Sequence, residues 1–158
     1  MDSKAELYIK RARAELDMAA LLFACSGNEI LGKFDIDSSQ TFYSGAIAHS
    51  YYAIFYSAKA MLLTKNITTE SPEIHRKTFD EFEKSFIKTG ILDIALLEIY
   101  RELVIRAETL LEIFREEKRK RGNYTYNTIA QANRPPAENS IKNAKTFFKH
   151  CQAYLNAN

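Results

Sequence analysis

A run of basic and aromatic side chains, REEKRKRGNYTYN at residues 115–127, is the stretch of the sequence best suited to bind a ligand. Its cations and the two tyrosines that follow are Arg115, Lys118, Arg119, Lys120, Arg121, Tyr124 and Tyr126. Basic groups attract a phosphate backbone, and aromatic rings stack on unpaired bases. The run therefore predicts contact with RNA or a nucleotide. The alternative is a charged helix end whose two tyrosines only anchor the following loop.

Metal-ligating side chains are few and scattered. The histidines and cysteines are His49, His75, His150, Cys25 and Cys151. No two cysteines have the spacing of a zinc finger, and the Glu-x-x-His pair of a di-iron bundle does not occur. The five glycines form no phosphate-binding loop. We therefore expect neither a metal nor a cofactor.

His49 lies in the most apolar stretch of the chain, beside Ser50 and Tyr51. One interpretation is a histidine whose ring is satisfied by a neighbouring hydroxyl or carbonyl group. The other is a polar pocket where this stretch meets a second helix. The candidate binding residues are therefore His49, Arg119, Arg121, Asn123, Tyr124 and Tyr126.

The apolar stretch itself, Thr41–Thr64, predicts a central helix that other helices cover. At a helical period it is apolar nearly all round, which is typical of a buried helix. His49, Lys59 and several hydroxyl side chains interrupt it, so it does not predict a membrane span. We expect Asp37, Ser38 or Ser39 to cap its start, and the connection 28–40 before it to be packed against the body of the protein.

Four further helices are predicted, because apolar residues recur at steps of three and four. They cover about 3–25, 71–90 and 93–120, and a last stretch from after Pro136 to about 155. Asp2 or Ser3 caps the first, and Ser71 caps the third with Pro72 at its first position. Without any strand pattern, repeat or linker, the sequence predicts an all-α fold. We expect an antiparallel up-and-down bundle of about five helices in a single domain, residues 1–158.

Composition places this bundle in the cytoplasm. The net charge of +2 is too small to imply nucleic acid by itself. Two cysteines do not make a disulfide framework, and the N-terminal residues are charged, with no apolar signal core.

Two strings resemble the HEPN domains, small helical bundles of prokaryotes and higher eukaryotes. Ser50-Tyr51-Tyr52-Ala53-Ile54-Phe55 resembles their YYA-x-F helix, although His49-Ser50 stands where an Arg often precedes Tyr-Tyr-Ala. Arg119-Lys120-Arg121-Gly122-Asn123-Tyr124 resembles the R-x-x-G-D-Y string of an uncharacterised bacterial and archaeal branch, with Asn in place of Asp. His75 also fits this branch.

The resemblance implies a helical bundle that pairs as a homodimer and is often encoded beside a minimal nucleotidyltransferase. Many HEPN proteins are metal-free ribonucleases or toxins that use an Arg followed, four to six residues later, by a His. No His follows Arg119 or Arg121 at that spacing. A tyrosine hydroxyl, with a pKa near 10, replaces a histidine proton shuttle poorly. The resemblance also makes Tyr126 a candidate for modification by the nucleotidyltransferase.

Three functions stay open at this point. The favoured one is a non-catalytic HEPN-like binding module, a dimer that presents Arg119–Tyr126 to RNA, a nucleotide or a nucleotidyltransferase partner in a toxin–antitoxin-like system. The second is a metal-independent endoribonuclease toxin with a non-standard site made from Arg119 or Arg121 and Tyr124. The third is a purely structural subunit that binds another protein.

Overall fold

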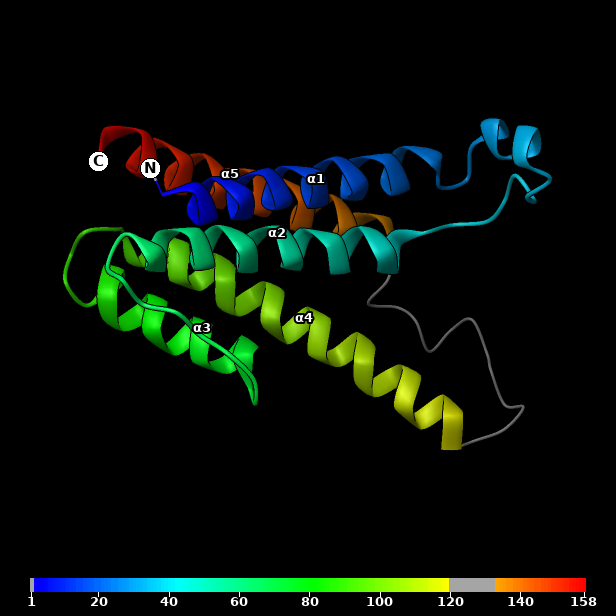
Figure 1. Ribbon diagram of the computed structural model, residues 1–158. Coiled ribbons are helices and arrows are strands. Elements are labelled where there is room, and N and C mark those ends of the chain that lie inside the picture. Colours follow the sequence, from blue (N-terminus) through cyan, green and yellow to red (C-terminus); the bar gives the residue numbers. More distant parts are fainter. Residues whose placement is uncertain (1, 120–132) are drawn as a thin grey trace.

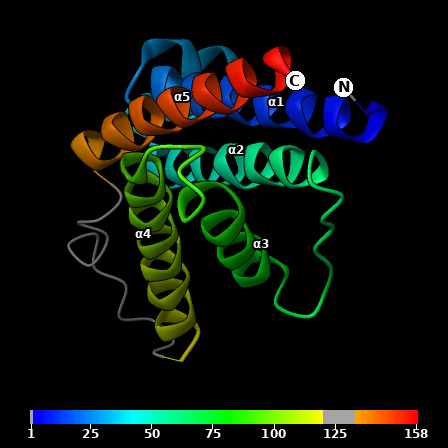
Figure 2. The same ribbon diagram turned by 90° about the vertical axis from the view of Figure 1, so that its left-hand side faces the viewer.

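The computed structural model describes residues 2–119 and 133–158, and every regular element in this part of the chain is helical. The elements are α1 (Ser3–Cys25), η1 (Glu29–Phe34), α2 (Tyr43–Leu63), α3 (Ile74–Phe82), η2 (Glu83–Ile87), α4 (Ile94–Arg119) and α5 (Arg134–Ala157). The predicted all-α bundle is confirmed. Helix α2 runs through its middle, with α1 and α5 on one side and α3 and α4 on the other (Figures 1 and 2).

The side of α2 toward α1 and α5 is packed with small residues. Each of the three helices carries one every seven positions: Ala5, Ala12 and Ala19; Ala46, Ala53 and Ala60; Ala137, Ala144 and Cys151. None of the nine is more than 1% exposed. A repeat of seven keeps one seam of a helix against its neighbours, as in a coiled coil. We call these nine residues the small-residue seam.

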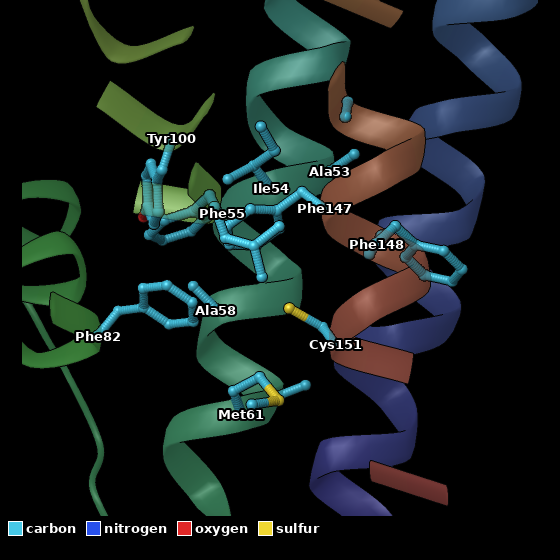
Figure 3. Close-up of a cluster of buried hydrophobic side chains, with 14 of the residues drawn as sticks. Ala53, Ile54, Phe55, Ala58, Met61, Phe82, Tyr100, Phe147, Phe148 and Cys151 are labelled. Atoms are coloured by element: carbon cyan, nitrogen blue, oxygen red, sulfur yellow. The ribbon is translucent and has the colours of Figure 1, made fainter. Parts of the chain in front are cut away.

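The side toward α3 and α4 is packed with large rings. Phe82, Phe86, Tyr100 and Phe147 are fully buried, and Phe82, Tyr100 and Phe147 lie together beside the second half of α2 (Figure 3). The ring centroids of Phe82 and Phe147 are 5.3 Å apart, and those of Tyr100 and Phe147 are 5.6 Å apart. These distances suit tilted and edge-to-face ring pairs. We call these four residues the aromatic cluster.

Helix α3 departs from the up-and-down arrangement, because it runs in the same direction as α2 (Figure 1). The segment 64–73 first returns along α2, where Lys59 Nζ donates to the carbonyl oxygen of Thr69 at 3.0 Å. The hydroxyl of Thr69 then bonds that of Thr78 at 2.6 Å. One part-buried and one buried polar contact therefore hold the return segment between the two helices.

Several predicted helix starts are wrong. Helix α3 begins at Ile74, after Glu73 in the left-handed conformation (φ 58°), so Ser71 does not cap it. Asp37 accepts from the backbone N–H of Ser39 at 2.8 Å instead of capping α2, which begins at Tyr43 without a capping side chain. Helix α5 begins before the two prolines, which occupy its first turn, where no N–H is required.

Other terminal signals are confirmed. The Asp2 side chain accepts from the N–H of Lys4, and Asp93 from that of Ala95. The connection before α2 is less packed than expected. In η1, Leu31 is buried, but Phe34 is 68% exposed, and the element projects from the bundle (Figure 1).

Candidate functional site

The predicted basic and tyrosine-bearing segment begins where α4 ends. Arg119 is the last residue of α4, while Arg121, Asn123, Tyr124 and Tyr126 lie outside the described residues. The C-terminal half of α4 points away from the other helices in both views (Figures 1 and 2). The end of this helix therefore stands clear of the rest of the bundle.

Arg106 fixes the direction of α4 relative to α5. Its guanidinium donates to Asn139 Oδ1 and to Ser140 Oγ, both at 2.9 Å, and pairs with Glu102 one turn before it on α4. Ser140 is fully buried, and the Arg106 side chain is 19% exposed. Charge-assisted hydrogen bonds of this kind are stronger than neutral ones. They hold α4 against the first turns of α5. These two helices precede and follow the basic and tyrosine-bearing segment in the sequence.

His49 lies on the other side of α2, toward α1. Its Nδ1 contacts Oε2 of Glu15, and Arg11 Nε donates to Oε1 of the same carboxylate at 2.8 Å. The Glu15 side chain is only 6% exposed, so its charge needs both partners. His49 is therefore bound to a carboxylate of a second helix, and not to a neighbouring hydroxyl or carbonyl.

Glu15 was not among the candidate residues that the sequence indicated. Its position gave a signal, because it lies three residues after Ala12 and four before Ala19, in line with both. A charged residue within an apolar stripe predicts a buried partner of opposite charge. Here the Glu15 carboxylate is shared between Arg11 of the same helix, whose side chain is 59% exposed, and His49 of α2.

A groove opens on the α3 and α4 side of α2, over the first half of that helix. It has a volume of about 570 Å³. Its lining is Ser44, Gly45, Ala48, Tyr51, Tyr52, His75, Arg76, Phe79, Val104, Ala107, Glu108 and Leu110. Most of this surface is apolar, and a groove of this size suits a small ligand or a partner's side chains. None of the binding residues predicted from the sequence lines this groove.

A polar contact in the groove joins α2 to α3. The hydroxyl of Tyr51 and Nδ1 of His75 are 2.7 Å apart. The His75 ring also packs on Phe55, with centroids 4.4 Å apart. Burial raises the pKa of the Tyr51 phenol, and burial followed by the charge of Lys59 lowers the pKa of His75. At neutral pH both rings are therefore uncharged.

Within residues 2–119 and 133–158, no three His, Cys, Asp or Glu side chains gather closely enough to hold a metal ion. None of the helices in the described ranges is both long and apolar enough to cross a membrane.

Two archaeal proteins are similar in sequence to this chain. "Putative toxin MJ0142" of Methanocaldococcus jannaschii is 40% identical over 81 residues, which are 48% of this chain and 53% of that protein. "Putative toxin MJ0605" of the same organism is 38% identical over 68 residues, 43% of this chain and 46% of that protein. The chain thus spans about half the length of the curated relatives it matches. No protein-family model and no solved structure matches it.

Proposed function

We propose that this protein is a HEPN-like binding module of a toxin–antitoxin-like system, active as a dimer. In this proposal the segment Arg119–Tyr126 contacts single-stranded RNA, a nucleotide or a partner nucleotidyltransferase. The observation that carries it is the 40% identity, over 48% of this chain, to the protein named "Putative toxin MJ0142". Two strings in this sequence that resemble HEPN domains, Tyr51-Tyr52-Ala53 and Arg119–Tyr124, support it.

The shape of the bundle supports the choice of segment. Helix α4 extends beyond the other helices, and the Arg106 contacts fix its direction (Figure 1). The segment 115–121 holds five basic residues, Arg115, Lys118, Arg119, Lys120 and Arg121. A cluster of cations at a projecting helix end favours a long, negatively charged partner, because such a partner reaches it without entering the bundle.

Fluorescence anisotropy with labelled single-stranded RNA tests this proposal. The expected result is binding that weakens as salt rises, and the variant Arg119→Ala with Arg121→Ala reduces the dependence of log affinity on log salt by about 1.4. The control is Lys145→Ala with Lys149→Ala, which removes the same charge from the exposed face of α5. Equal losses in both variants would mean non-specific attraction, and no binding at low salt would reject RNA as the ligand.

Cleavage is separated from binding in the same mixtures. RNA recovered intact after incubation in EDTA agrees with a binding module. Fragments that disappear with Arg119→Ala would instead make the protein a metal-independent ribonuclease. The role of a nucleotidyltransferase partner needs a separate experiment. The parent protein and a Tyr126→Phe variant are each co-expressed with a minimal nucleotidyltransferase, and their masses are compared to test whether the partner modifies Tyr126.

A further inference from the structure

The groove between α2, α3 and α4 has the walls of a small-molecule site. Tyr51 and Tyr52 of α2 and Phe79 of α3 supply aromatic surface. Val104 and Leu110 of α4 supply aliphatic surface opposite them. Tyr52 is 38% exposed, so part of its ring is available to a ligand. Sites for small ligands are mainly apolar cavities with a few placed polar groups.

The charged groups around this groove favour a cation. Glu108 lines it from α4, and its carboxylate contributes, after burial and Tyr52, to the raised pKa of Tyr51. The negative charge of Glu108 therefore acts on the ring surface inside the groove. His75 does not oppose a cation at neutral pH, because burial lowers its pKa.

The positive charges near the groove are largely neutralised by carboxylates or engaged in other contacts. Arg76 lies 3.6 Å from Glu73 and 3.8 Å from Asp80, so two carboxylates surround its charge. Arg101 lies 5.8 Å from the centre of the Phe79 ring. Lys59 is bonded to the carbonyl oxygen of Thr69. Of the side chains that line the groove, Glu108 and Arg76 are charged at neutral pH, and Glu73 and Asp80 offset the charge of Arg76.

We propose that this groove binds a compact organic cation, an ammonium group carried on an apolar or aromatic body. The ammonium lies beside Glu108 and against the rings of Tyr51 and Tyr52, because the faces of aromatic rings carry partial negative charge. The body fills the apolar space between Phe79 and Val104. The proposal uses no residue of the Arg119–Tyr126 segment and does not depend on RNA or partner binding there.

A series of three probes with the same ring tests the charge requirement. The probes are 2-phenylethylammonium, 2-phenylethanol and phenylacetate, titrated by calorimetry. The ammonium is expected to bind about 5- to 30-fold more tightly than the alcohol, and phenylacetate more weakly than both. Carbon-detected shifts of the Val104 and Leu110 methyl groups locate the probe in the groove.

Two variants identify the groups that recognise the charge. Glu108→Gln keeps the size of an exposed side chain and is expected to lower the affinity for the ammonium to that of the alcohol. Tyr52→Leu is expected to lower the affinity for the ammonium and to leave that for the alcohol within about twofold. The control Glu98→Gln removes an exposed carboxylate from the same helix, away from the groove, and should change neither affinity.

Several results would overturn the proposal. They are equal affinities for the three probes, tighter binding of phenylacetate, methyl shifts outside the groove, or no binding of the ammonium at millimolar concentration. An equal loss with Glu98→Gln would also overturn it, because the attraction would then be general. Thermal melting of each variant checks that the fold is intact.

Discussion

The two sides of α2 are packed with side chains of opposite size, and only one side is closed. Toward α1 and α5, the small-residue seam is buried along its whole length. Toward α3 and α4, the aromatic cluster fills the second half of the interface (Figure 3). The groove occupies the first half. The same helix therefore forms a closed core on one side and one wall of the groove on the other.

Side-chain size explains this difference. Small residues let helix backbones approach closely, whereas rings hold them apart. The fully buried rings of Phe82, Tyr100 and Phe147 fill the space near residues 54–61 of α2. Near residues 44–52, the rings of Tyr51, Tyr52 and Phe79 line the groove instead of filling it. Among the described residues, the groove therefore begins where the fully buried rings end.

The largest loss of stability is expected when a ring is removed from the aromatic cluster. Phe82→Ala removes a fully buried ring that contacts Phe86, Tyr100 and Phe147. We expect a loss of about 3–5 kcal/mol in the free energy of unfolding, measured by urea denaturation. Phe34→Ala is the control, because that ring is 68% exposed. A loss below about 1 kcal/mol for Phe82→Ala would mean that the cluster does not hold α3 in place.

A matched pair of substitutions on α2 compares the two sides directly. Ala53→Leu adds volume inside the closed seam and should cost about 1–3 kcal/mol. Ala48→Leu makes the same change where the groove has room, and should cost less than about 0.5 kcal/mol. It should also weaken the binding of 2-phenylethylammonium by occupying the groove. Equal costs in urea denaturation would contradict the difference between the two sides.

Much of this arrangement could be predicted from local patterns. The apolar stripes of α1, α2, α4 and α5 indicated which faces are buried, and Asp2 and Asp93 marked two helix starts. These signals lie within a few residues of the structure that they specify. The direction of α3 could not be predicted in this way. It depends on contacts of Lys59 and Thr78 with Thr69, which join separate elements.

The candidate sites show the same limit. The Arg119–Tyr126 segment was found because its side chains are neighbours in the sequence. The groove could not be predicted in this way, because its lining residues come from three helices that are far apart in the sequence. In the sequence, Tyr51 was notable only as part of the string Ser50–Phe55, and His75 only as one of three scattered histidines. A site made by the divergence of helices has no local signature.

Removal of the buried Tyr100 hydroxyl is expected to have a smaller effect on stability, and one of opposite sign. This atom is fully buried and has no hydrogen-bond partner among the described residues. An unpaired buried polar group destabilises a fold, so Tyr100→Phe should raise the free energy of unfolding by about 1 kcal/mol. Tyr51→Phe is the contrasting variant, because it breaks the bond to His75 and should lower stability by about 1 kcal/mol. A loss of stability in Tyr100→Phe would show that its hydroxyl is paired.

The smallest expected effect is on the pH dependence of stability, and it comes from His75 at the groove. Burial, followed by the charge of Lys59, lowers the pKa of His75 below its ordinary value of 6.5. As the pH falls below 6.5, the unfolded chain binds a proton before folded His75 does, so protonation favours unfolding. This contribution stops growing once the pH is below the folded pKa.

His75→Gln should therefore flatten the fall in stability on the acid side of pH 6.5. The measurement is urea denaturation at a series of pH values, and the exposed His150 of α5 provides the matched control, His150→Gln. The same substitution in both positions separates a histidine held against Tyr51 and Phe55 from one on the surface. An unchanged pH profile in His75→Gln would mean that the open side of α2 does not bury this ring enough to alter its protonation.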